Sequence, residues 1–126
     1  MDVLSSRLLL RPTDHARSRA FYEQTLGLGV AREFGPPEQP GVVFFLGGGF
    51  LELSGSSAQP PRLDLWLQVP DVGAEHRRLV AAGVRVTREP RQEPWGLVEM
   101  WIEDPDGVRI VLVQVPPDHP LRRDLR

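Results

Sequence analysis

The chain has 126 residues, of which 40% are hydrophobic and 25% are charged, and its formal net charge is −2. This is the length and composition of one ordinary globular domain, and the charge gives no reason to expect nucleic acid or an anionic membrane as a partner. The sequence has no Cys, no apolar run as long as a membrane span and no visible signal peptide, so disulfides and thiolate chemistry are excluded and a cytoplasmic protein is expected.

The first half of the chain predicts a strand, a helix and three more strands. Residues 6–11 alternate in polarity as a strand does, and Thr13 or Asp14 can cap a helix over residues 15–26 that Gly27 ends. Three further strands are expected over 30–34, 42–46 and 50–53, separated by loops rich in Pro and Gly. Residues 55–62 are poor in apolar side chains and are expected to form a linker.

The second half predicts the same order of elements. A strand over residues 63–69 is followed by a helix over 72–82 that begins after Asp71 and stops at Gly83. Three more strands are expected over 84–88, 97–103 and 108–115, with a loop over 89–95. The polar residues 116–126 are expected to form a loose tail.

The spacing of the punctuating residues indicates an internal repeat. Asp14 and Asp71 are 57 residues apart, and Gly27 and Gly83 are 56 apart. The predicted fold class is therefore α+β, with two tandem βαβββ modules, about 6–54 and 63–115, in a single domain. We expect them to form a curved mixed sheet with helices outside and a concave cleft inside.

The strand over residues 63–69 has two unlike faces. Its Leu and Val side chains point one way, and Asp64, Trp66 and Gln68 point the other. A carboxylate, a large aromatic ring and an amide in a row suit the wall of a binding cavity better than plain solvent.

Three stretches carry a resemblance to a known family. Residues 14–28, with Arg17-Ser18, Phe21-Tyr22 and Leu26-Gly27-Leu28, resemble the first-helix signature of the vicinal oxygen chelate superfamily, which includes glyoxalases, bleomycin resistance proteins and dioxygenases. Residues 102–107, Ile-Glu-Asp-Pro-Asp-Gly, resemble its last hairpin, and residues 86–90 resemble a stretch of its glyoxalase branch. The resemblance implies the paired βαβββ fold, usually in a homodimer.

The resemblance also implies four places for metal ligands, and this sequence departs from the pattern there. Family enzymes hold a divalent metal through His, Gln or Glu, and the corresponding places fall on Arg7, Glu52, Asp64 and Val111. Arg has no lone pair to give, Val has no donor atom, and two carboxylates alone make a poor site for Zn, Ni or Fe. We therefore expect no metal and no cofactor. Our hypothesis is that Arg7 neutralises Glu52, with Asp64 as a second candidate partner; the alternative is that Arg7 reaches solvent at a sheet edge.

The expected ligand-binding residues point inward by alternation and mix aromatic walls with a few charges. They are Arg7, Leu9, Phe50, Glu52, Asp64, Trp66, Gln68, Glu99, Trp101 and Val111. Trp66 and Trp101 can stack on a flat ligand or fill the cleft themselves, and the loop residue Trp95 can close the cleft or cover a sheet edge. The three His fall outside the inward strand positions, so surface placement is expected for them, and no catalytic residue is assigned.

These patterns favour a small-molecule-binding protein that is independent of metal and takes an aromatic or partly polar drug or metabolite. The alternative is a metal-dependent lyase, isomerase or dioxygenase of the same superfamily, and a third possibility is a scaffold whose cleft its own side chains fill. The sequence does not decide whether the protein is an enzyme, because resemblance at the level of the fold does not fix chemistry.

Overall fold

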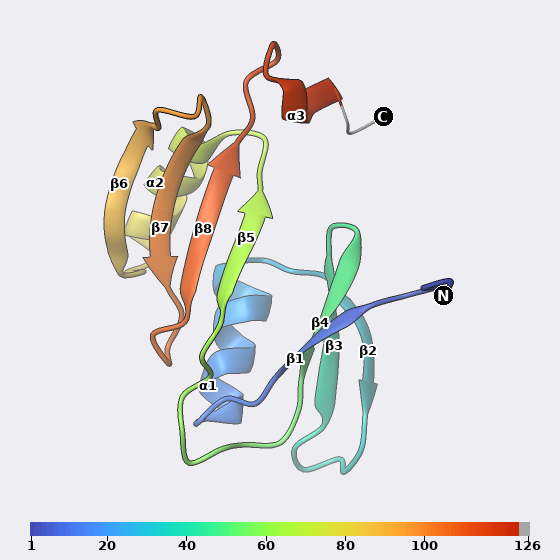
Figure 1. Ribbon diagram of the computed structural model, residues 1–126. Helices are drawn as coiled ribbons and strands as arrows, with labels where there is room; N and C mark the ends of the chain where they lie inside the picture. Colours follow the sequence, from blue (N-terminus) through green and yellow to red (C-terminus); the bar gives the residue numbers. More distant parts are fainter. Residues whose placement is uncertain (124–126) are drawn as a thin grey trace. The chain divides into compact units, whose positions relative to one another are not determined.

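Two four-stranded mixed sheets carry the fold, one in each half of the chain (Figure 1). The computed structural model describes residues 1–123. It divides into two compact units, one of residues 1–62 with 105–107, the other of residues 63–104 with the chain from 108 onward.

The first unit contains one sheet and one bent helix. Its strands are β1 (Arg7–Leu10), β2 (Val30–Phe34), β3 (Gly41–Leu46) and β4 (Gly49–Leu53), in the spatial order β1-β4-β3-β2. The helix α1 (His15–Ala20) continues as a π-helical segment, η1 (Phe21–Thr25). The β1–β4 pair is parallel and the other pairs are antiparallel.

The second unit repeats this arrangement. Its strands are β5 (Asp64–Gln68), β6 (Val86–Gln92), β7 (Val98–Glu103) and β8 (Arg109–Gln114), in the order β5-β8-β7-β6 with β5 parallel to β8. The helix α2 (Val72–Ala81) packs against β6, β7 and β8. The predicted pair of βαβββ modules is confirmed. No helix within residues 1–123 is long and apolar enough to cross a bilayer.

Two expectations about the second unit were wrong. Strand β6 runs on through residues 89–92, which were expected to form a loop. Pro90 is tolerated there because β6 is an edge strand with an irregular register. The tail is also not simply loose, because it contains a short helix, α3 (Pro120–Arg123).

The same local chemistry begins and ends the helix of each module. The Asp14 carboxylate accepts a hydrogen bond from the Arg17 amide at 3.1 Å, and the Asp71 carboxylate accepts one from the Ala74 amide at 3.0 Å. Each side chain satisfies a backbone N–H that has no partner within the helix. Gly27 and Gly83 follow with φ of +77° and +78°, a backbone conformation that side chains with a Cβ rarely adopt.

Strand alternation places most of the fully buried apolar side chains of each sheet on one face. In the first unit, buried Tyr22 of η1 packs on buried Phe44 of β3, with ring centroids 6.3 Å apart. In the second unit, alternate side chains of β5, β7 and β8 are buried in the core, as is Leu79 of α2. On the opposite face of each sheet, the alternating positions carry aromatic and charged side chains.

Two side chains tie α1 to the rest of the first unit. His15 was expected at the surface, but it is buried, with Nε2 3.0 Å from the Pro40 carbonyl and Nδ1 3.3 Å from the Gly55 carbonyl. Arg19 donates to Glu33 at 3.0 Å, and this hydrogen bond lowers the pKa of Glu33. The contribution of this contact is therefore kept at neutral pH and lost as the pH falls through that lowered pKa.

We expect Leu51→Ala to lower the free energy of unfolding by about 2–5 kcal/mol, because Leu51 is fully buried and the change leaves a cavity. Leu9→Ala is the matched control, because Leu9 is 65% exposed and its loss should cost less than about 0.5 kcal/mol. Urea unfolding followed by circular dichroism measures both. Equal effects of the two changes would contradict the described alternation.

Candidate functional site

The face of the second sheet opposite α2 gathers three rows of side chains, which the strand register defines. The middle row crosses the sheet as Trp66, Val111, Trp101 and Arg88. The flanking rows are Asp64, Arg109 and Glu103 on one side, and Gln68, Val113, Glu99 and Arg91 on the other. We call this surface the tryptophan face.

Trp101 lies between arginines that come from the strands on either side of it. The guanidinium carbon of Arg88 lies 4.5 Å from the centroid of the Trp101 ring, and that of Arg109 lies 4.7 Å from it. Both distances are within the range of cation–π attraction. A carboxylate holds each arginine in turn: Asp64 accepts from Arg109 Nε at 3.2 Å, and Glu93 accepts from Arg88 Nη2 at 3.0 Å. Two charged side chains therefore help to hold the indole in place.

Glu99 is a buried carboxylate that two indoles hold. Its side chain accepts hydrogen bonds from Trp95 Nε1 at 2.7 Å and from Trp101 Nε1 at 3.4 Å, while the residue is only 5% exposed. No ion pair to Glu99 is present within residues 1–123. Trp95 and Trp66 nevertheless keep large exposed surfaces, 55% and 49%. The tryptophan face thus offers aromatic surface around a buried negative charge.

The corresponding face of the first sheet carries the predicted ion pair. Arg7 Nη1 donates to Glu52 Oε1 at 2.8 Å, which confirms the expected pairing. The second oxygen of Glu52 accepts from Ser54 Oγ at 3.1 Å. Phe45 and Phe50 lie beside this pair in the sheet, with ring centroids 5.7 Å apart.

The four places where the family holds a metal do not fit a metal ion in this chain. Arg7 is a cation and forms an ion pair with Glu52, and Arg109 forms an ion pair with Asp64. Val111 offers no donor atom. Across residues 1–123, no group of three His, Cys, Asp or Glu side chains could hold a metal. The sequence hypothesis named Asp64 as a second partner of Arg7; its observed partner is Arg109.

The predicted site residues fall in two groups, one in each unit. Arg7, Leu9, Phe50 and Glu52 belong to the first sheet, and Asp64, Trp66, Gln68, Glu99, Trp101 and Val111 belong to the second. Sequence reasoning missed Arg88, Arg109 and Glu93. Arg109 had a readable signal, because it alternates with Val111 along one strand. The other two lie in a stretch that was expected to end as a strand at Arg88 and continue as a loop.

The order of strands and the two capped helices define a protein of paired βαβββ modules. Residues 5–112 match the model of the Glyoxalase/Bleomycin resistance protein/Dioxygenase superfamily, and the chain belongs to that superfamily. No curated protein matches the chain closely enough to count as a relative.

Solved structures share this fold. TnmS3, an antibiotic binding protein from Streptomyces sp. CB03234, is 24% identical with a TM-score of 0.76, and the match covers 91% of this chain and 98% of that one. A superfamily member from Sphaerobacter thermophilus DSM 20745 is 22% identical with a TM-score of 0.74, covering 90% and 98%. TioX from Micromonospora sp. ML1 is 18% identical with a TM-score of 0.76, covering 90% and 100%.

We expect Glu93→Gln to destabilise the protein by about 1–3 kcal/mol, because the buried Glu93 carboxylate binds both Arg88 and Arg91. The change should also alter the near-ultraviolet circular dichroism of Trp101, because Arg88 loses its anchor. Glu89→Gln is the control, because Glu89 is an exposed carboxylate whose one ion-pair partner within residues 1–123 is His76. An unchanged Trp101 signal in Glu93→Gln would show that Glu93 does not position Arg88.

Proposed function

We propose that this protein binds a small, flat, partly polar organic molecule on the tryptophan face, without a metal ion. The observation that carries the proposal is the middle row, in which Trp66 and Trp101 flank Val111 on one face. Strands two positions apart are separated by about 10 Å. Flat groups pack at about 3.5–4 Å. The space over Val111 therefore suits a single ring system between two aromatic walls.

The charges beside this space indicate which part of a ligand is polar. Arg109 lies against Trp101 and is paired with Asp64, and both of these charged side chains are partly exposed. Planar guanidinium groups stack on aromatic rings and donate to carbonyl, phenolate or carboxylate oxygens. An aromatic molecule with such an oxygen matches the site, and an antibiotic-binding protein of the same fold is consistent with this class of ligand.

The proposed independence of metal rests on the side chains that lie at the four places where the family holds its metal. A guanidinium and a valine stand where the metal-dependent members place ligands, and both carboxylates already have cationic partners. Within residues 1–123, no group of three His, Cys, Asp or Glu side chains supports the metal-dependent enzyme considered as the alternative. The proposed physiological form is a homodimer in the cytoplasm, and light scattering of the purified protein would test whether it is a dimer.

We expect less than about 0.1 metal ion per chain in protein purified without chelator or affinity tag, because the donor set is poor. Elemental analysis measures the content, before and after incubation with Zn, Ni, Mn and Fe salts. A content near one metal per chain would contradict the proposal and revive the enzyme alternative.

Ligand binding is tested with tryptophan fluorescence, because all three Trp lie in the second unit. Against a panel of aromatic natural products with carbonyl or phenolic oxygens, Trp66→Ala should weaken binding about tenfold or more, since a stacked indole is a typical binding hot spot. Val111→Trp should block binding by filling the space between the two walls. Val80→Ala is the control, because Val80 is an exposed apolar residue of α2. If Trp66→Ala and Val111→Trp bind the ligand as tightly as the unchanged protein, the binding site lies elsewhere.

A further inference from the structure

The segment after β8 is fastened to the loop before β7 by one histidine. His119 Nε2 lies 3.0 Å from the Trp95 carbonyl, and His119 Nδ1 accepts a hydrogen bond from the Leu121 amide at 3.1 Å. Since Nδ1 accepts, Nε2 carries the proton and donates to Trp95. The imidazole also lies against Gly96, where an added Cβ would come within 3.1 Å of His119 Cδ2. The His119 side chain thus forms one hydrogen bond within its own segment and one with the loop before β7.

The same segment contributes an apolar contact to the tryptophan face. Leu121 of α3 packs against a cluster of Leu97, Val113 and Val115, all of which are buried. Val111, the residue between Trp66 and Trp101, packs against this cluster too. By strand alternation the cluster lies on the face opposite α2, so Leu121 extends the apolar surface on which a ligand would rest.

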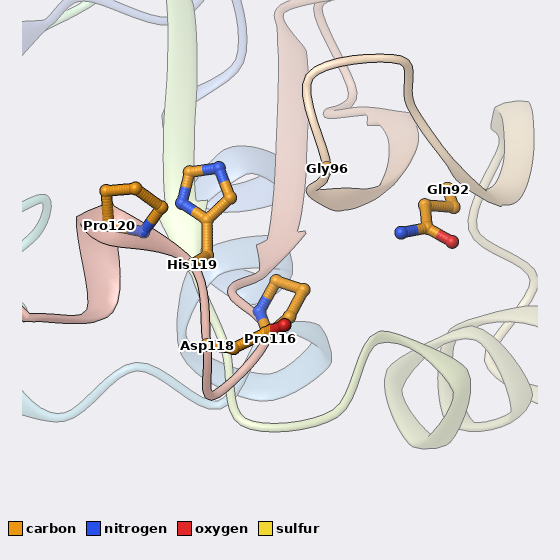
Figure 2. A pocket seen from close by; sticks show the side chains of 6 residues that line it. All are labelled: Gln92, Gly96, Pro116, Asp118, His119 and Pro120. Atoms are coloured by element: carbon orange, nitrogen blue, oxygen red, sulfur yellow. The ribbon is translucent and has the colours of Figure 1, made fainter.

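The contact between the segment and the loop is not tightly packed. A cavity of about 240 Å³ lies there, lined by Gln92, Gly96, Pro116, Asp118, His119 and Pro120 (Figure 2). In Figure 2 the Gln92 amide faces this space across from His119 and Pro116. This pocket is open, so the groups that border it are not packed against protein on that side. The attachment therefore rests mainly on His119 and Leu121, which makes it separable.

We propose that residues 116–123 form a strap that limits the size of the ligand that the tryptophan face accepts, with His119 and Leu121 as its specificity-determining residues. This inference rests on the proposed function of that face. Trp95 is the link: its carbonyl accepts from His119, while its indole donates to Glu99. A ligand that displaces the backbone of the loop at Trp95 must also break the His119 contact. Large ligands can therefore bind only the fraction of molecules in which the strap is open, and their apparent affinity is reduced in proportion to that fraction.

The test separates the two roles of His119. In His119→Asn the shorter side chain can still accept from the amide two residues on, as Asn does in turns, but it cannot reach Trp95. A second variant lacks residues 118–126, and a matched control lacks only 124–126. The probes are anilinonaphthalene sulfonate and its double-sized dimer, bis-anilinonaphthalene sulfonate, whose fluorescence reports binding to apolar surface.

In His119→Asn and in the variant lacking 118–126, affinity for the larger probe should rise about fivefold or more relative to the smaller one, because the cost of opening the strap is gone. The control deletion should leave the ratio unchanged. The indole N–H resonance of Trp95 should shift in His119→Asn without any probe, since its backbone anchor is lost.

The outcomes distinguish the strap from the proposed function. Probe binding that depends on Trp66, with a ratio unchanged in both strap variants, would overturn the strap and leave the binding face in place. A changed ratio that does not depend on Trp66 would support a strap but count against the proposed ligand site. An unshifted Trp95 resonance in His119→Asn would show that His119 does not attach the strap to the Trp95 loop.

Discussion

Ion pairs on the face of each sheet opposite its helix shape the candidate site. Arg7 pairs with Glu52, Asp64 with Arg109, and Arg88 with Glu93. Removing one partner of a shielded pair leaves a charge without compensation, which costs more than the pair contributes. This cost applies to Arg88 and the buried Glu93, whereas the Arg7–Glu52 and Arg109–Asp64 pairs are more exposed and contribute less to the fold. Because they already satisfy one another, a ligand meets a surface of nearly balanced charge.

The pairing also shows how a repeat can diverge without losing its architecture. Arg7 and Asp64 occupy equivalent places, 57 residues apart, yet they have opposite charges. Each is paired across the parallel strands of its own sheet, with β4 supplying the carboxylate in one unit and β8 the guanidinium in the other. The two sheets keep the same strand order while their faces differ, phenylalanines in the first and tryptophans in the second.

Local patterns made most of the fold predictable, while side-chain contacts with loop carbonyls were not. Alternation and the capping residues Asp14 and Asp71 depend on neighbours along the chain, so the sequence shows them directly. The pairing of Arg7 with Glu52 could be inferred because strand positions within a known fold are comparable. The contacts of His15 and His119 could not, because each depends on a loop carbonyl whose position only the folded chain defines. For a polar residue outside a regular strand, the sequence does not indicate which residue lies opposite it.

The three indoles differ in how far they are fixed before any ligand arrives. Trp95 and Trp101 are held by Glu99, and Trp101 is also within cation–π distance of two guanidinium groups, so neither loses much side-chain freedom on binding. Trp66 is half exposed, and within residues 1–123 its side chain has neither a hydrogen bond nor a ring contact. It can therefore adjust to ligands of different thickness while the opposite wall stays in place. One rigid wall and one adaptable wall suit a protein that holds related aromatic molecules rather than a single one.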